Sequence, residues 1–240
     1  MCGRYVLKRQ DLEALLKQLG VKDPREFVSR YNIAPGTIVP AVRMSREGER
    51  EAVGLDWGLV PRWAKDPREG ARMANARAEG IATKPAFRDA FRRRRAVVPA
   101  SGFYEWQTIG RLKQPWYFER ADGAPFVFAS LWESWRSPEG VELETCSLIT
   151  TTPNDVVRPL HDRMPVILRG PAVDTWLDPA VADPEALEPL LQPLPAEELK
   201  ATPVAPLVNS VRHDGPELIA PATPLRGEPP PSSQLSLGLE

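Results

Sequence analysis

The chain of 240 residues contains 42% hydrophobic and 8% aromatic residues, which supplies a packed core and excludes wholesale disorder. Its two cysteines cannot build a disulfide framework, and Arg4, Lys8 and Arg9 lie where a secretion signal would be apolar. The net charge of −1 hides an asymmetry, because residues 1–120 hold 24 Lys and Arg against 14 Asp and Glu, whereas the rest holds 7 against 18. The basic half indicates a surface that meets a polyanion, although a simply solvated basic face would have the same composition.

The first predicted element is an amphipathic helix at about residues 10–19, where four leucines recur at helical spacing before Gly20. A second helix is predicted to begin near Pro85, with Phe87 and Phe91 facing inward. Residues 96–99 predict a strand, and this strand is expected to lead into a loop at residues 101–106.

The middle of the chain predicts strands at residues 114–120 and 126–132, joined as a hairpin because Asp122-Gly123 tolerates the positive φ of a tight turn. A further strand is predicted at residues 143–152. Short helices are expected at residues 155–160, 171–177 and 184–191. Since strands and helices do not alternate regularly, the sequence predicts a mixed α+β fold built on antiparallel sheet. No apolar run is long enough to cross a membrane, so we expect a soluble, cytoplasmic monomer.

Cys2 is the most informative single position, because removal of Met1 would place an α-amine and a thiol on adjacent carbons. An α-amine has a pKa near 7.8 against about 10.4 for lysine, so about 400-fold more of it is in the neutral, nucleophilic form at pH 7. Such an amine attacks an aldehyde to give a Schiff base, and the thiol can then close a five-membered thiazolidine. A second-position cysteine without any role is the alternative.

Two further residues could transfer protons. His161 precedes an apolar run and has an ordinary pKa near physiological pH, although a satisfied structural histidine fits the same position. Glu105 lies between Tyr104 and Trp106, where partial desolvation would raise its pKa, unless it simply alternates outward on a strand. The cysteines and histidines contain no short ligand pair, so we expect no metal site and no cofactor.

Asn75 and Arg77 are spaced two residues apart, so on a strand they would face the same side. The amide could orient a nucleophile there, and the guanidinium could hold a phosphate. Three tryptophans could offer flat surfaces to unpaired bases or could belong to the core: Trp57, Trp63 and Trp106.

Six blocks of sequence occur together and in order: Met1-Cys2-Gly3-Arg4-Tyr5, Tyr31-Asn32-Ile33-Ala34-Pro35, Trp57-Gly58-Leu59-Val60-Pro61, Asn75-Ala76-Arg77-Ala78-Glu79, Pro99 with Gly102-Phe103-Tyr104-Glu105-Trp106, and His161-Asp162-Arg163-Met164-Pro165. With these blocks, which span about residues 2–212, the sequence resembles the SOS-response-associated peptidase (SRAP) family, the abasic-site processing proteins. Gly36, Gly80 and Ala96 depart from the family's usual residues, and none of them carries a reactive group.

The resemblance implies an α+β domain with a central, barrel-like antiparallel sheet, peripheral helices and a basic cleft for single-stranded DNA. It implies that Cys2 links to the ring-opened abasic sugar, that Asn75 positions the amine, that Glu105 is the acid/base, and that His161 shuttles a proton. The residues implied to hold or shape the DNA are Arg4, Pro35, Trp63, Arg77, Trp106 and Arg163.

Two rival interpretations stay open. Cys2, His161 and Glu105 could instead be the thiol, base and orienting acid of a cysteine peptidase, including one that removes only Met1. A binding module that holds single strands without forming a bond would use the same arginines and tryptophans.

The predicted domain covers residues 2–226, and residues 227–240 are predicted to be a disordered tail rich in Gly, Pro and Ser. The tail ends in a glutamine followed by spaced leucines, which resembles the peptide with which bacterial repair proteins dock on the DNA sliding clamp. The residues of this clamp-binding hypothesis are Gln234, Leu235, Leu237 and Leu239, although the pattern is short enough to arise by accident.

Overall fold

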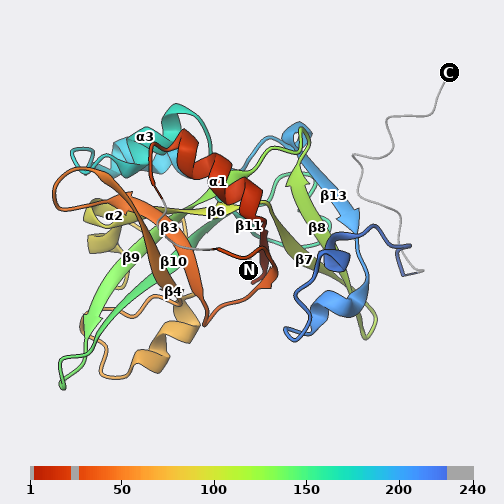
Figure 1. The fold of residues 1–240 in the computed structure, drawn as a ribbon, viewed down its shortest axis with the longest axis horizontal. Coiled ribbons are helices and arrows are strands. Elements are labelled where there is room, and N and C mark those ends of the chain that lie inside the picture. Colours follow the sequence, from red (N-terminus) through yellow and green to blue (C-terminus); the bar gives the residue numbers. More distant parts are fainter. Residues whose placement is uncertain (1–2, 23–26, 226–240) are drawn as a thin grey trace.

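The computed structural model describes residues 3–22 and 27–225, and most of its strands belong to two sheets that lie side by side (Figure 1). The smaller sheet is antiparallel throughout, with the strand order β13-β8-β7-β1-β2. Its strands are β1 (Tyr5–Leu7), β2 (Arg30–Ile33), β7 (Gly102–Ile109), β8 (Leu112–Arg120) and β13 (Leu199–Pro203).

The larger sheet closes into a five-stranded barrel, because the path β10-β4-β3-β6-β9 returns to β10. The barrel strands are β3 (Ile38–Met44), β4 (Arg50–Trp57), β6 (Arg95–Ala100), β9 (Phe126–Arg136) and β10 (Glu142–Thr151). All barrel pairings are antiparallel except β4 with β10. Three short strands extend this sheet: β5 (Asn75–Arg77), β11 (Met164–Pro165) and β12 (Ile167–Leu168). The predicted α+β fold with a barrel-like central sheet is therefore confirmed.

Helices pack against the outside of the barrel, and two short ones, η4 (Pro206–Asn209) and η5 (Pro216–Ile219), pack against the smaller sheet. The first helix, α1 (Arg9–Gln18), matches the predicted helix and buries Leu12, Leu15 and Leu16. It contacts β6, and α3 (Pro171–Leu177) lies against the same strand. The remaining helices are α2 (Arg88–Arg93), α4 (Pro184–Leu187), and the 3-10 helices η1 (Pro67–Met73), η2 (Glu188–Leu191) and η3 (Ala196–Glu198). Among the described helices, none has the length and hydrophobicity that a membrane crossing requires.

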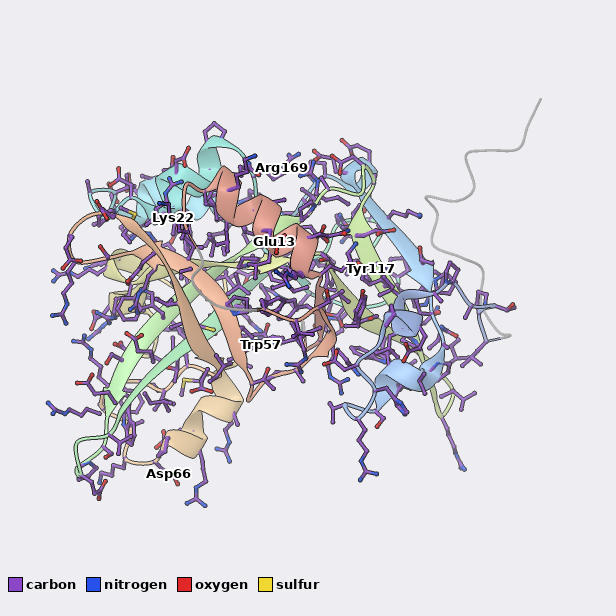
Figure 2. The ribbon with its side chains drawn as sticks, viewed as in Figure 1. Glu13, Lys22, Trp57, Asp66, Tyr117 and Arg169 are labelled. Atoms are coloured by element: carbon purple, nitrogen blue, oxygen red, sulfur yellow. The ribbon has the colours of Figure 1, made fainter. Side chains whose placement is uncertain are left out.

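Aromatic side chains join the two sheets at the N-terminal strand. Tyr5 of β1 is completely buried, and its ring meets Trp57 edge-on at 5.6 Å and Phe128 at 5.7 Å between centroids. The indole N–H of Trp57 donates to the carbonyl oxygen of Ala74 at 2.8 Å. Trp57, labelled in Figure 2, is therefore a core residue and offers no surface to a ligand. This packing fixes the start of the described chain against the barrel.

Residues 101–106, predicted as a loop, mostly belong to strand β7 instead. Phe103 contributes to the main core and Tyr104 to a second core on the other face, so the strand is buried on both sides and lacks polar alternation. Gly102 is required by packing, because a Cβ there would lie 2.5 Å from the carbonyl oxygen of Phe118.

Two other sequence predictions were also wrong. Strands β8 and β9 exist, but they do not pair as a hairpin, because β8 joins the smaller sheet and β9 joins the barrel. The turn at Gly123, with φ of +72°, carries the chain from one sheet to the other. The helix predicted at residues 155–160 is a series of turns, since Pro159 has no N–H with which to continue a helical ladder.

Candidate active site

A cavity of about 550 Å³ is lined by residues from five separate parts of the chain. Its described lining residues are Gly3, Arg4, Glu105, Trp106, Lys113, His161 and Asn209. Four of the predicted site residues therefore meet here: Arg4, Glu105, Trp106 and His161. Cys2 lies outside the described residues, and its chain neighbour Gly3 is part of the cavity wall.

Glu105 projects from the middle of β7, where its residue pairs with Trp116 of β8, and only 2% of it is exposed. Burial is the main reason that the pKa of the carboxyl group rises from 4.5 to about 8, and the charge of Asp162 contributes to this rise. Within the described part of the chain, its Oε1 atom is buried without a hydrogen-bond partner. A carboxyl group in this environment is protonated at neutral pH, and the upward shift predicted from its aromatic neighbours is confirmed in direction.

His161 reaches the same cavity from the turn that precedes β11, and its side chain is 26% exposed. Burial lowers the pKa of the imidazole, so the neutral ring is the form present at pH 7. In that form Nδ1 accepts a hydrogen bond from the backbone N–H of Arg163 at 3.0 Å. The nearby Oδ1 of Asp162, at 2.9 Å, can accept from Nδ1 only when that nitrogen carries a proton, and a protonated Nδ1 could not accept from Arg163. The proton of the neutral ring therefore sits on Nε2, which makes His161 a hydrogen-bond donor.

Arg4 and Trp106 form another part of the wall. The guanidinium carbon of Arg4 lies 5.8 Å from the centroid of the Trp106 ring. Nη1 of Arg4 donates to Oδ1 of Asn32 at 2.7 Å and to the carbonyl oxygen of Val208 at 2.9 Å. Burial lowers the pKa of Arg4, and the group remains cationic. One edge of this guanidinium is thus fixed by the protein, and within residues 3–22 and 27–225 its other N–H groups have no hydrogen bond.

Asn75 and Arg77 lie on β5, which pairs in parallel with β10. The strand geometry places the two side chains on one face, as predicted, while Ala76 is buried between them. Arg77 is exposed, whereas Oδ1 of Asn75 is buried. Neither residue is among the described residues that line the cavity.

Arg163 makes its contacts inside the protein. Its Nη1 and Nη2 atoms donate to the two carboxylate oxygens of Glu79 at 2.7 and 2.8 Å. Nη2 also donates to the carbonyl oxygen of Thr150 at 2.5 Å, and the residue is only 8% exposed. The guanidinium therefore fastens the turn around His161 to β10, and its expected contact with DNA stays a prediction.

The other implied DNA contacts lie on open surface. Pro35 is exposed in the turn between β2 and β3, and Trp63 is 62% exposed. Trp63 borders a second groove of about 330 Å³, which also contains Arg62, Arg92, Arg93, Arg94, Asp89 and Glu133. The tail residues Gln234, Leu235, Leu237 and Leu239 lie outside the described part of the chain.

Lys113 and Asn209 line the cavity and were not singled out from the sequence. Lys113 lies near the start of β8, and Asn209 ends η4 close to the C-terminus. Neither position has a neighbouring motif that would mark it. In the described residues no cluster of three or more His, Cys, Asp or Glu side chains could hold a metal ion.

Comparison with known proteins places this architecture in one family. The family model "SOS response associated peptidase (SRAP)" matches residues 1–211. The chain is 39% identical over 224 residues to the abasic site processing protein YoqW of Bacillus subtilis (strain 168), covering 91% of this chain and 99% of that protein. It is 33% identical over 227 residues to the abasic site processing protein YedK of Escherichia coli (strain K12), covering 92% and 100%. A crystal structure of a protein from Bacteroides thetaiotaomicron superposes with a TM-score of 0.83 at 25% identity, covering 92% of this chain and all of that one. The chain therefore belongs to the SOS response associated peptidase family.

Proposed function

We propose that this protein processes abasic sites by forming a covalent thiazolidine between Cys2, exposed after removal of Met1, and the ring-opened sugar in single-stranded DNA. The observation that carries the proposal is the buried carboxyl group of Glu105, whose pKa burial raises to about 8, on a cavity whose wall includes Gly3, the residue next to Cys2. The names of the relatives, abasic site processing proteins, support the same class of substrate.

The chemistry needs one acid and one base and no cofactor. The closed sugar opens when its anomeric hydroxyl loses a proton and its ring oxygen gains one, which yields the C1′ aldehyde. The α-amine of Cys2 adds to this aldehyde, and the resulting carbinolamine loses water to give an imine. The thiol then adds across the C=N bond, its sulfur bonding to C1′ and its proton passing to nitrogen. Aldehyde and aminothiol thus combine with the loss of one water.

Glu105 fits the acid in this sequence, because a protonated carboxyl group can donate to the ring oxygen and then to the departing hydroxyl. Once ionised, it can take back the proton that the attacking amine loses. His161 fits a donor that holds a sugar hydroxyl, since its Nδ1 already accepts a backbone N–H and its neutral ring carries a proton on Nε2. Asn75 would position the amine, as the family resemblance implies.

Backbone phosphates would bind to arginines. Arg4 has guanidinium N–H groups that are not used by Asn32 and Val208, and Arg77 is exposed on β5. Contacts of this kind carry no base specificity, so binding would be independent of sequence and sensitive to salt. Pro35, Trp63 and Trp106 would shape the strand on either side of the lesion.

The peptidase interpretation is less well supported by the site. In a thiol–histidine–acid arrangement the acid is ionised and holds the histidine through Nδ1. Here burial keeps Glu105 protonated, and Nδ1 of His161 accepts from a backbone amide. Removal of Met1 by the protein itself remains compatible with the proposal, because capture requires a free Cys2.

The decisive test is an adduct that survives denaturation. Purified protein is mixed with a labelled single strand that contains one abasic site, and the products are separated in detergent after heating. We expect an adduct with this strand and none with an intact strand of the same length. The Cys2→Ala variant keeps an α-amine but no thiol, so it should give an adduct only when borohydride reduces the imine.

The rival interpretations predict other results from the adduct test. A Cys2→Ala adduct that resists heat without borohydride would refute the thiazolidine. Binding without any adduct in the wild-type protein would favour the non-covalent module, and cleavage of peptides in trans would favour the peptidase.

We also propose that the tail docks on the replication sliding clamp, on the basis of Gln234, Leu235, Leu237 and Leu239 alone. Docking through this segment would raise the local concentration of the protein where single strands are exposed. The test titrates the clamp with a labelled peptide of residues 228–240, beside a peptide that carries Gln234→Ala and Leu237→Ala. Equal or absent binding of both peptides would exclude the docking.

A further inference from the structure

A loop near the C-terminus, residues 204–214, forms part of the cavity wall and is fastened to the N-terminal half of the chain by a polar network. The side-chain amide of Asn32 on β2 donates to the carbonyl oxygens of Val208 at 3.2 Å, Ser210 at 3.0 Å and His213 at 2.8 Å. In return, the carboxylate of Asp214 accepts from the backbone N–H of Tyr31 at 2.5 Å and of Asn32 at 2.8 Å. This loop therefore has a defined position relative to the strands of the smaller sheet.

Asn209 presents its side chain from this loop to the cavity. Its Oδ1 accepts a hydrogen bond from the indole Nε1–H of Trp106 at 2.6 Å. Its Nδ2 donates to the backbone carbonyl of Lys113 at 3.4 Å, the longest bond of the set. One amide thus bridges the edge of the Trp106 ring and strand β8, which are both parts of the cavity wall.

An exposed indole N–H does not need a protein partner, since water can satisfy it. The N–H is the only polar atom of the tryptophan side chain, so a partner at a fixed place selects one orientation of the ring plane. The guanidinium of Arg4 lies over the ring face, but a face contact does not determine how the ring turns in its own plane. The hydrogen bond between Trp106 and Asn209 constrains this rotation of the ring, which the contact with Arg4 does not.

We propose that Asn209 is a positioning residue, which holds the Trp106 ring as a fixed wall against which the sugar and the neighbouring base are placed beside Glu105. The effect on DNA rests on the proposed function, whereas the orientation of Trp106 does not. Because its described hydrogen bonds join it to Trp106 and Lys113, Asn209 acts on the binding of DNA and leaves the proton transfers of Glu105 unchanged.

The test measures adduct formation with the abasic single strand over a range of DNA concentrations. A net hydrogen bond contributes about 1 kcal/mol, so Asn209→Ala should raise the half-saturating DNA concentration about fivefold. The rate at saturating DNA and its pH dependence should stay within about twofold of wild type. Trp106→Phe keeps a ring but removes the N–H, so Asn209→Ala should add nothing further in that background.

A spectroscopic arm needs no DNA. In protein labelled with fluorotryptophan, the chain gives one fluorine resonance for each of its 7 tryptophans, and the resonance absent from Trp106→Phe identifies Trp106. Asn209→Ala should shift or broaden that resonance and leave the others in place. If the wild-type protein forms no adduct, the proposed function fails and this arm still decides the position of the ring.

Three results would overturn the proposal. An unchanged Trp106 resonance would show that the hydrogen bond does not set the ring. A lower saturated rate or a shifted pH profile would assign Asn209 to the chemistry itself. The same fivefold loss in the Trp106→Phe background would show that Asn209 acts through the fold alone.

Discussion

The burial of Glu105 predicts a specific dependence of stability on pH, which can be measured without any substrate. The carboxyl group has a pKa of about 8 in the folded protein and an ordinary value of 4.5 when the chain is unfolded. The folded state therefore binds the proton more tightly. The resulting stabilisation is fully present below pH 4.5, and it is lost as the pH rises toward 8.

The magnitude follows from the width of that interval. Between pH 5.5 and 7.5 the folded protein keeps the proton and the unfolded chain has mostly lost it, so each pH unit lowers the free energy of unfolding by close to 1.36 kcal/mol. Two units correspond to roughly 2–3 kcal/mol. Glu105→Gln keeps the shape and cannot titrate, so its free energy of unfolding should lack this decline.

The assay is urea denaturation of wild type and Glu105→Gln at both pH values, followed by tryptophan fluorescence. The quantity of interest is the difference between the two pH-dependent changes, because the groups common to both proteins then cancel. Glu188→Gln removes an exposed carboxylate and serves as the control, with a decline like that of wild type. Equal declines in wild type and Glu105→Gln would refute a buried, protonated Glu105.

Four further predictions concern the site and the fold. Adduct formation should slow as the pH rises past about 8, because Glu105 then loses its proton, and a rate series from pH 6 to 9.5 should lack this alkaline limb in Glu105→Gln. Arg77→Ala should weaken binding to all DNA sequences alike, as measured by fluorescence anisotropy, and the slope of log affinity against log salt concentration should fall by about one phosphate contact. Arg163→Ala should instead lower the melting temperature, because Arg163 binds Glu79 inside the protein. Gly102→Ala should reduce the free energy of unfolding by about 1–3 kcal/mol in urea, because its Cβ meets a carbonyl oxygen at 2.5 Å; stability equal to wild type would contradict the packing argument.

Much of the site could be predicted because its residues belong to short, recognisable blocks. Arg4, Glu105, Trp106 and His161 lie in such blocks, and the structure brings all four to one cavity. The shift of Glu105 was also predictable in direction, since Tyr104 and Trp106 flank it in the sequence. The prediction that residues 101–106 form a loop was wrong, whereas the prediction that Glu105 is desolvated was correct.

The wrong hairpin and the missed Asn209 share a physical cause, which is that local sequence does not specify long-range partners. The turn at Asp122-Gly123 forms as predicted, but the partners of β8 and β9 are decided by packing over long range. Asn209 was missed for the same reason, since its value comes from a hydrogen bond to a residue 103 positions earlier in the chain. Arg163 was expected to contact DNA, and its sequence block does not show that its guanidinium donates both Nη groups to the carboxylate of Glu79.

A buried carboxyl group can keep its proton only if the backbone that carries it cannot move toward water. β7 pairs with β8 along its whole length, from Phe103 with Phe118 to Ile109 with Leu112. The Phe103 and Phe118 rings stack at 4.9 Å between centroids, and the Tyr104 hydroxyl donates to the carbonyl oxygen of Tyr31 at 2.9 Å. These contacts hold β7 from both faces, so a movement of Glu105 toward water would disrupt packing or hydrogen bonds of the strand. The same rigidity makes ionisation of this carboxyl group unfavourable above neutral pH, and it keeps a protonated acid beside the cavity below neutral pH.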